Sequence, residues 1–182
     1  MAFIRRNSTP PKSQPMTSSG QFSASQLLEK AKTLGVCILP LDIHSLTKAL
    51  GIDLLAIPMD DNISGSLSAY PNKQGWLIKV NSLHHPNRQR FTIAHELGHY
   101  FKHRNEQNDF VDQNFFRNSE SNRIETEANR FAGDLLMPED EFRLAVKSLS
   151  GSIEAVAQKF MVSTLAVRVR AKALGMKGHG LD

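Results

Sequence analysis

Hydrophobic positions in the first part of the chain recur at helical spacing. Apolar residues between 27 and 34 lie three or four positions apart and precede a glycine, which predicts a helix that begins after Ser23 or Ser25. Residues 43–50 repeat this spacing between Asp42 and Gly51 and predict a second, shorter helix. Two amphipathic helices are therefore expected before residue 52.

The spacing of apolar residues changes to that of strands in the next segment. Three short runs, at 53–57, 63–70 and 76–80, are apolar or alternate loosely, and loops rich in Pro, Asn and Gly separate them. Such short loops leave no room for the helical crossovers that join neighbouring parallel strands. We therefore expect a small antiparallel or mixed sheet.

Helical spacing returns after Pro86. The apolar residues from 91 to 101 predict one long helix, and Pro86 suits its first turn. The following segment, 104–122, has no clear period and is expected to be a partly packed loop. Another helix is predicted at about 121–136, where a proline follows it.

The C-terminal pattern completes an α+β architecture. Residues 139–175 predict three further short helices, so a C-terminal helical subdomain is expected over about 139–176. With 182 residues and 40 % hydrophobic content, the chain fits one compact domain, which we place at 23–182. Residues 1–22 are rich in Pro, Ser, Thr and Gln and are expected to form a disordered tail, although their composition also fits an organelle transit peptide.

Composition narrows the class of protein further. No run of about 18 apolar residues is present to span a bilayer, and the single Cys37 forms neither an internal disulfide nor a cysteine-based zinc module. A reducing, cytoplasmic location fits best. The net charge of +4 suits a nucleic-acid partner, but the excess of cations lies in 1–22 and 155–182, while the middle of the chain is net acidic.

The candidate chemistry lies in the long helix. His95, Glu96 and His99 form an H-E-x-x-H sequence, in which the two histidines stand four residues apart on one helix face and can bind one metal ion. The alternative is that these are two ordinary surface or core histidines that bind no metal. The position of the motif inside a predicted helix favours the metal site, because the geometry requires a helix.

A catalytic zinc site needs a third protein ligand. The metzincin extension of the motif fails, because Lys102 and Asn105 stand where glycine and histidine are required. His103 lies eight residues after His95, or about 12 Å along a helix, which is too far to share one ion with it. We expect His103 at the helix end, either supporting the site or on the surface.

The next helix offers two carboxylates. On a helical wheel, Glu125 falls within the apolar arc of 124–135, whereas Glu127 lies about 110° from the centre of that arc and faces water. A carboxylate on a buried face needs a partner, so Glu125 is the expected third ligand. Asn129 lies one turn later and is expected to hold the outer nitrogen of a metal-binding histidine, unless it is simply an exposed asparagine.

Glu96 is then free to act as the general base. A zinc ion lowers the pKa of its bound water toward about 7, and the expected role of Glu96 is to take the proton and deliver it to the leaving amine. Tyr70, His84 and His85 are open candidates for the donor that stabilises the oxyanion. The predicted reaction is metal-assisted amide hydrolysis.

Residues 90–99 (RFTIAHELGH), 124–132 (IETEANRFA) and 135–138 (LLMP) resemble the ImmA/IrrE family of metallopeptidases. The resemblance implies a zincin-like fold, one Zn²⁺ per chain and Glu125 as its third ligand. It also implies a cytoplasmic protease that cleaves a helix-turn-helix repressor in a stress, phage or mobile-element response. The segment 76–80 would then be either the sheet edge above the site or an interior strand.

A rival interpretation comes from residues 152–170. Two short helices separated by a turn resemble a helix-turn-helix, with Arg168, Arg170 and Lys172 available for phosphates. Arg168 and Arg170 lie about 200° apart on a helix and form no single stripe, so direct DNA binding is the less favoured prediction. The other alternative is a metal-binding regulator that docks on a repressor without cutting it.

Overall fold

The computed structural model describes residues 22–71, 74–105, 108–112 and 123–176. Its helices are α1 (Ala24–Thr33), α2 (Ile43–Ala49), α3 (Pro86–Lys102), α4 (Arg123–Leu136), α5 (Glu139–Ser148), α6 (Ile153–Phe160) and α7 (Thr164–Ala173). Its strands are β1 (Asp53–Ile57), β2 (Gly65–Ala69), β3 (Trp76–Asn81) and β4 (Asp109–Asp112). The predicted tail lies outside the described residues except for Phe22, whose ring packs edge-on against Phe101.

Helix starts follow the sequence signals. Ser23 caps α1 through a reciprocal capping box with Gln26, and the Asp42 carboxylate accepts the backbone N–H of Ser45 at the start of α2. These contacts satisfy backbone donors that a helix end otherwise leaves without partners. The predicted α+β fold class is confirmed.

The four strands form one mixed sheet in the order β1-β3-β2-β4. β1 runs parallel to β3, whereas β3–β2 and β2–β4 are antiparallel. Of the two alternatives for residues 76–80, the interior strand is confirmed and the sheet edge is wrong, because β1 pairs with the other side of β3. The edge strands are β1 and β4.

β4 also corrects the expectation of a loop over 104–122. Residues 109–112 pair with β2, and Phe110 stands opposite Leu67 with both side chains buried. Four residues are too few for an alternation of polar and apolar positions to predict a strand. Their pairing with β2 determines their conformation. Residues 113–122 of the predicted loop lie outside the described part of the chain.

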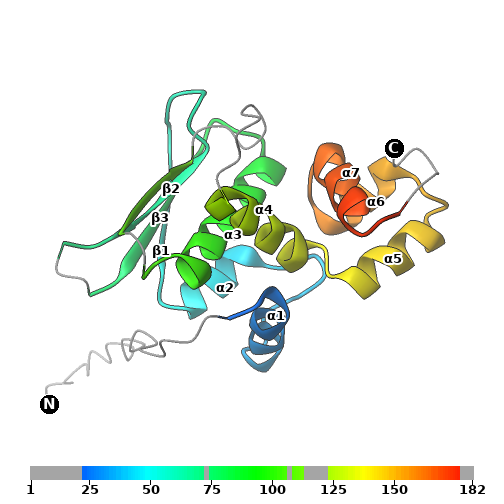
Figure 1. Cartoon of the computed structure of the whole chain (residues 1–182), viewed down its shortest axis with the longest axis horizontal. Helices are drawn as coiled ribbons and strands as arrows, with labels where there is room; N and C mark the ends of the chain where they lie inside the picture. Colours follow the sequence, from blue (N-terminus) through cyan, green and yellow to red (C-terminus); the bar gives the residue numbers. More distant parts are fainter. Residues whose placement is uncertain (1–21, 72–73, 106–107, 113–122, 177–182) are drawn as a thin grey trace, which may run out of the picture.

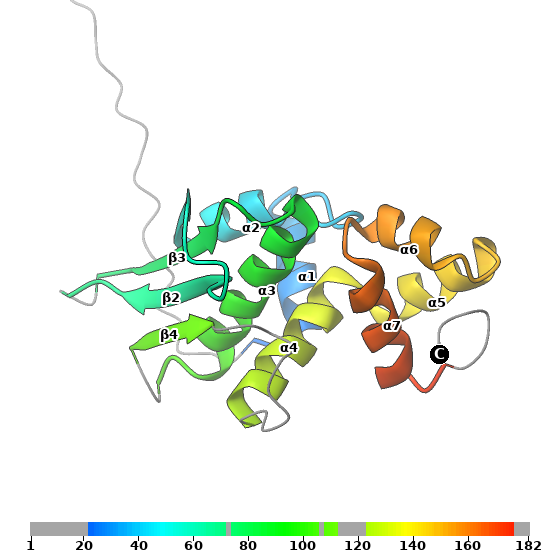
Figure 2. The same cartoon turned by 90° about the horizontal axis from the view of Figure 1, so that it is seen from above.

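The helices cover one face of the sheet and extend away from it. α3 packs on β2 and β3, and α4 lies beside α3 on the side away from the sheet (Figures 1 and 2). The C-terminal helices α5, α6 and α7 gather at the far end of α4 (Figure 2). None of the described helices combines the length and apolar character needed to cross a membrane.

α3 and α4 cross in close contact at Gly98. A Cβ atom at this position would lie 3.0 Å from the Cα of Ala128 and 3.1 Å from its carbonyl oxygen. Two small residues therefore let the helix backbones approach each other, because a larger side chain at either position would separate them. Gly98 directly precedes His99, and Ala128 lies in the first half of α4, so this contact brings the histidines of α3 close to the start of α4.

The Gly65→Ala substitution should lower the thermal stability of the protein. A Cβ at Gly65 would lie 2.4 Å from Cγ2 of Thr92 and 2.7 Å from the carbonyl oxygen of Lys79, so the backbone must shift, at a cost of about 1–3 kcal/mol. The matched control is Gly133→Ala within α4, where a Cβ meets only Arg170 at 4.0 Å and helix propensity gains up to about 1 kcal/mol. Thermal unfolding that ranks Gly65→Ala at or above Gly133→Ala would contradict this packing.

Candidate metal centre

Two histidines of α3 and one glutamate of α4 converge on one point. His95 and His99 lie one helical turn apart and are buried, with exposed fractions of 0 % and 1 %, and their Nε2 atoms are 2.9 Å apart. Oε2 of Glu125 lies 3.2 Å from Nε2 of His95, and Oε1 lies 3.4 Å from Nε2 of His99. The fold thus brings Glu125 next to two histidines that lie 26 and 30 positions before it in the chain.

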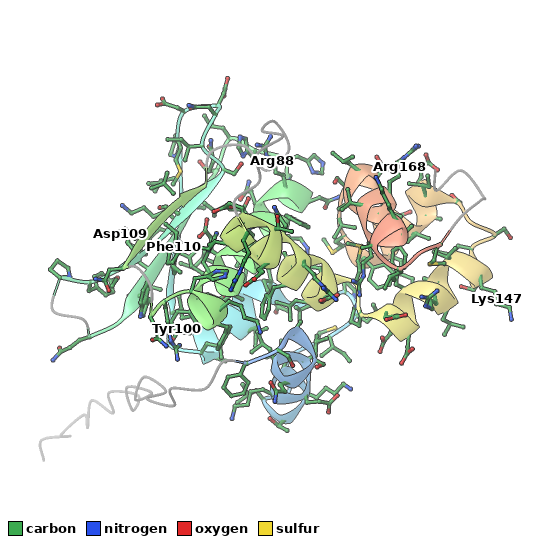
Figure 3. The ribbon with its side chains drawn as sticks, viewed as in Figure 1. Arg88, Tyr100, Asp109, Phe110, Lys147 and Arg168 are labelled. Atoms are coloured by element: carbon green, nitrogen blue, oxygen red, sulfur yellow. The ribbon has the colours of Figure 1, made fainter. Side chains whose placement is uncertain are left out.

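The imidazole of His99 is also held by the sheet. Phe110 of β4 stacks on it, with a centroid distance of 4.5 Å and an interplanar angle of 20°. Figure 3 shows Phe110 and Asp109 at the edge of the sheet that lies against the helices. The stacking restricts rotation of the His99 ring, so its Nε2 stays directed toward His95 and Glu125.

Hydrogen bonding and burial fix the state of His95. Its Nδ1 lies 3.1 Å from Oδ1 of Asn129, and because an amide oxygen only accepts, His95 donates its Nδ1 proton. Burial lowers the pKa of His95 to about 4, so the imidazole is neutral at pH 7. Its Nε2 therefore carries a lone pair toward His99 and Glu125.

The carboxylate of Glu125 completes the donor set. Burial raises the pKa of this group, but the nearby imidazoles of His95 and His99 more than offset that effect, and the pKa falls below its usual value. Glu125 is therefore ionised at neutral pH. Its oxygens and the Nε2 lone pair of His95 all face one point, which is an arrangement that a cation stabilises.

These donors fit a divalent metal. Ligand atoms about 2.1 Å from one ion at tetrahedral angles lie about 3.4 Å apart, and the observed separations are 2.9, 3.2 and 3.4 Å. His95, His99 and Glu125 are the residues in the described part of the chain whose ligand atoms cluster in this way. Two imidazoles and a carboxylate suit Zn²⁺, Mn²⁺ or Fe²⁺.

The metal-free protein should lose stability as the pH falls from 7 to 5. Unfolded His95 takes up a proton near its ordinary pKa of 6.5, whereas folded His95 resists protonation to about pH 4, so acid favours the unfolded state. This linkage predicts a loss of about 2 kcal/mol, measured by denaturant unfolding in chelator. In the His95→Gln variant, the free energy of unfolding should depend less on pH. If it falls equally steeply in both proteins, groups other than His95 cause the pH dependence.

The exposure of the two glutamates differs from the wheel prediction. The side chain of Glu125 is 39 % exposed and that of Glu127 is 42 % exposed, so burial does not separate them. Glu125 lies in the first turn of α4, where the end of the helix leaves its carboxylate partly open. Direction separates them instead, because Glu125 points to His95 and His99 while Glu127 points to His103.

His103 is the main site neighbour that the sequence left undecided. It ends α3 and is only 2 % exposed, so the surface alternative is wrong. Its Nδ1 lies 3.3 Å from Nδ1 of His99, and its Nε2 lies 3.2 Å from Oε2 of Glu127. The spacing of four residues from His99 is the sequence signal that places the two rings together.

Glu96 follows His95 in α3 and faces the start of β2. It is fully buried, and a Cβ built on Gly65 at the start of β2 would lie 3.4 Å from its Oε1. The glycine therefore lets β2 pass close to the carboxylate. Glu96 thus lies between the helix and the sheet, one residue from His95 along the chain.

Two of the three candidate oxyanion donors, Tyr70 and His85, form hydrogen bonds with other groups of the chain. The Tyr70 hydroxyl donates to Oδ2 of Asp53 at 2.6 Å, and Nδ1 of His85 accepts the backbone N–H of Asn87 at the start of α3. His85 is thus about 15 Å along the helix from His95, which is too far to act at that site. His84 is the partly buried neighbour of His85, and its burial lowers its pKa.

The three predicted C-terminal helices are confirmed, but the expectation that all three cations of the last helix are available for phosphates is wrong. Arg170 is buried and donates through Nε to the carbonyl oxygen of Met137 at 2.9 Å, while its guanidinium pairs with Asp134 of α4. It is therefore not available for phosphates. Arg170 is buried together with the apolar residues of α7, whereas Arg168 and Lys172 are exposed. Figure 3 labels Arg168 on this helix.

Known proteins place the fold in a family. Among solved structures, a Mycobacterium tuberculosis transcriptional regulator matches 86 % of this chain at a TM-score of 0.54 and 18 % sequence identity. This chain spans about half of that protein, 48 % of its length, so the likeness shows the shared fold alone. No curated protein matches significantly. Residues 47–172 match the M78 peptidase family, described as the IrrE N-terminal-like domain, whose peptidases depend on a metal. The chain therefore belongs to the IrrE N-terminal-like family of metallopeptidases.

Proposed function

We propose that this chain is a zinc-dependent endopeptidase that hydrolyses one peptide bond in a helix-turn-helix transcriptional repressor and so relieves repression. The observation that carries the proposal is the convergence of His95, His99 and Glu125 beside a second, buried carboxylate, Glu96. Membership of a metallopeptidase family supports the reaction class. The choice of substrate rests on the resemblance of the motifs to ImmA/IrrE proteins.

Each residue of the site has a separate task in the proposed reaction. His95, His99 and Glu125 hold the zinc ion, and Asn129 keeps the proton of His95 on Nδ1. A bound zinc ion supplies Lewis acidity, which lowers the pKa of water and polarises the scissile carbonyl. Glu96 is not one of the three metal ligands, so its carboxylate can accept and donate a proton.

Glu96 is the proposed general base and then the general acid. Its carboxylate accepts a proton as the water oxygen bonds to the carbonyl carbon of the substrate. It then gives that proton to the nitrogen as the C–N bond breaks, so the products are a carboxylic acid and an amine, which become a carboxylate and an ammonium group at neutral pH. Its burial beside β2 keeps bulk water from competing for the proton.

The substrate proposal is tested with the helix-turn-helix regulator encoded beside the gene. We expect the zinc-loaded chain to cut this regulator at one position and to leave unfolded casein largely intact, measured by gel electrophoresis and mass spectrometry of the fragments. Cutting of casein at a comparable rate would argue against a dedicated repressor peptidase. A stable complex without fragments would favour the docking regulator.

Direct DNA binding remains the less favoured alternative. Arg168 and Lys172 are the cations of α7 on its exposed side, but Arg170 is committed to Asp134 and Met137. Affinity for duplex DNA that falls steeply with salt and depends on Arg168 would support this function. Without such binding, the C-terminal helices are assigned to support of the fold or to docking of the repressor.

A further inference from the structure

An outer hydrogen-bonded chain continues from the candidate metal centre to the surface. His103 at the end of α3 connects His99 on its own helix to Glu127 on α4, with contacts of 3.3 and 3.2 Å. Glu127 also accepts from Nε of Arg123 at 2.8 Å. The imidazole of His103 is buried, so these two contacts determine where its proton lies.

The directions of these hydrogen bonds follow from the chemistry of the groups. An ionised Glu127 carboxylate only accepts, so Nε2 of His103, which lies 3.2 Å from its Oε2, donates to it. A neutral His103 then has its lone pair on Nδ1 and accepts the Nδ1 proton of His99. His99 is left with a lone pair on Nε2, directed toward His95 and Glu125.

His95 and His99 are therefore held by the same kind of contact. Asn129 accepts the Nδ1 proton of His95 directly, whereas His99 is held through His103 by Glu127. Both outer supports come from α4, the helix that also carries Glu125. Arg123 adds little, because its side chain is 84 % exposed and surface ion pairs contribute under about 1 kcal/mol.

We propose that His103 and Glu127 are positioning residues that fix the proton and the ring orientation of His99, so that its Nε2 is ready to bind the metal. This role rests on the metal site of the proposed function. It gives Glu127 a task distinct from that of Glu125: Glu127 acts on the metal through His103 and His99. Outer partners of this kind also raise the basicity of the histidine that they hold.

The test replaces His103 in two ways. His103→Leu removes the acceptor for His99, and we expect zinc affinity to fall about 10- to 100-fold in competition with a chromophoric chelator. His103→Asn places an amide oxygen near the position of Nδ1, so affinity should recover to within a few-fold of wild type. Glu139→Ala is the control, because it removes the 2.8 Å pair with Arg143 on α5, far from the histidines.

A second readout separates positioning from general support of the fold. Long-range proton–nitrogen NMR spectra of the zinc-loaded protein should show His99 protonated on Nδ1 in wild type and in His103→Asn, but not uniformly in His103→Leu. Thermal unfolding of the metal-free variants shows whether each remains folded, and an unfolded His103→Leu leaves Glu127→Ala to make the comparison. Glu127→Ala should weaken zinc binding by up to about tenfold.

The outcomes distinguish this role from the metal site itself. If wild type binds zinc but His103→Leu binds it equally well, or if His103→Asn is no better than His103→Leu, the positioning role is wrong and the metal site stands. If wild type binds no zinc, both proposals fail.

Discussion

The Glu125→Ala variant should lose zinc at concentrations that saturate the wild-type protein. Its carboxylate lies 3.2 and 3.4 Å from the Nε2 atoms of His95 and His99, and removing it leaves two imidazoles to hold the ion. Because a catalytic zinc site needs three protein ligands, we expect affinity to fall by more than about 100-fold. Metal analysis after dialysis measures the effect directly.

Glu127→Ala is the matched comparison. The two glutamates are two residues apart on α4 and have nearly equal exposed fractions, 39 % and 42 %, so a nonspecific loss of charge affects both alike. We expect Glu127→Ala to retain zinc with affinity reduced by up to about tenfold, because it acts only through His103. Loss of zinc from Glu127→Ala alone would overturn the assignment of Glu125 as the third ligand.

Glu96→Gln should keep its zinc and lose about 10²- to 10⁴-fold in the rate of peptide hydrolysis. The amide has nearly the same shape as the carboxylate but cannot accept the proton of the attacking water. The residue is not among the clustered ligand atoms, so metal binding should be unchanged. The measurement is kcat for cleavage of the regulator, alongside the zinc content of the same sample.

A control for Glu96→Gln comes from the same helix. Gln89 is part of α3 but binds the backbone carbonyls of Ser82 and His84, at the opposite end of the helix from His99. Gln89→Ala should therefore change stability and leave hydrolysis near the wild-type rate. Wild-type hydrolysis by zinc-loaded Glu96→Gln would exclude Glu96 as the general base.

Most of the helical framework could be predicted from local signals. Ser23, Asp42 and Pro86 stand at the beginnings of three helices, and the apolar spacing between such signals gave their extents to within a few residues. The H-E-x-x-H sequence needs only one helix to bring its histidines together. These features are local, so one segment at a time contains the necessary information.

What the sequence did not reveal depends on pairing between distant segments. β4 forms because residues 109–112 meet β2, and β3 becomes an interior strand because β1 joins its other side. Arg170 is buried because Asp134 and the carbonyl of Met137, on another helix and its end, accept its protons. No spacing within a single segment contains these contacts.

The candidate site falls between these two cases. The spacing located His95 and His99, and the apolar arc of α4 singled out Glu125, although its burial was overestimated. His103 required the structure, because the decisive question was whether its ring turns toward His99 or toward solvent. The wheel could not assign Glu127 a partner, since that partner lies at the end of a different helix.

We propose that a metal held by His95, His99 and Glu125 drives cleavage of a repressor. The most direct measurement is a time course of intact mass for the helix-turn-helix regulator incubated with the protein as loaded with zinc, after chelation, and after zinc is restored. We expect two fragments whose masses add up to the intact regulator plus one water, no cleavage after chelation, and recovery of cleavage with zinc. Fragments that continue to form at the same rate in excess chelator would contradict it.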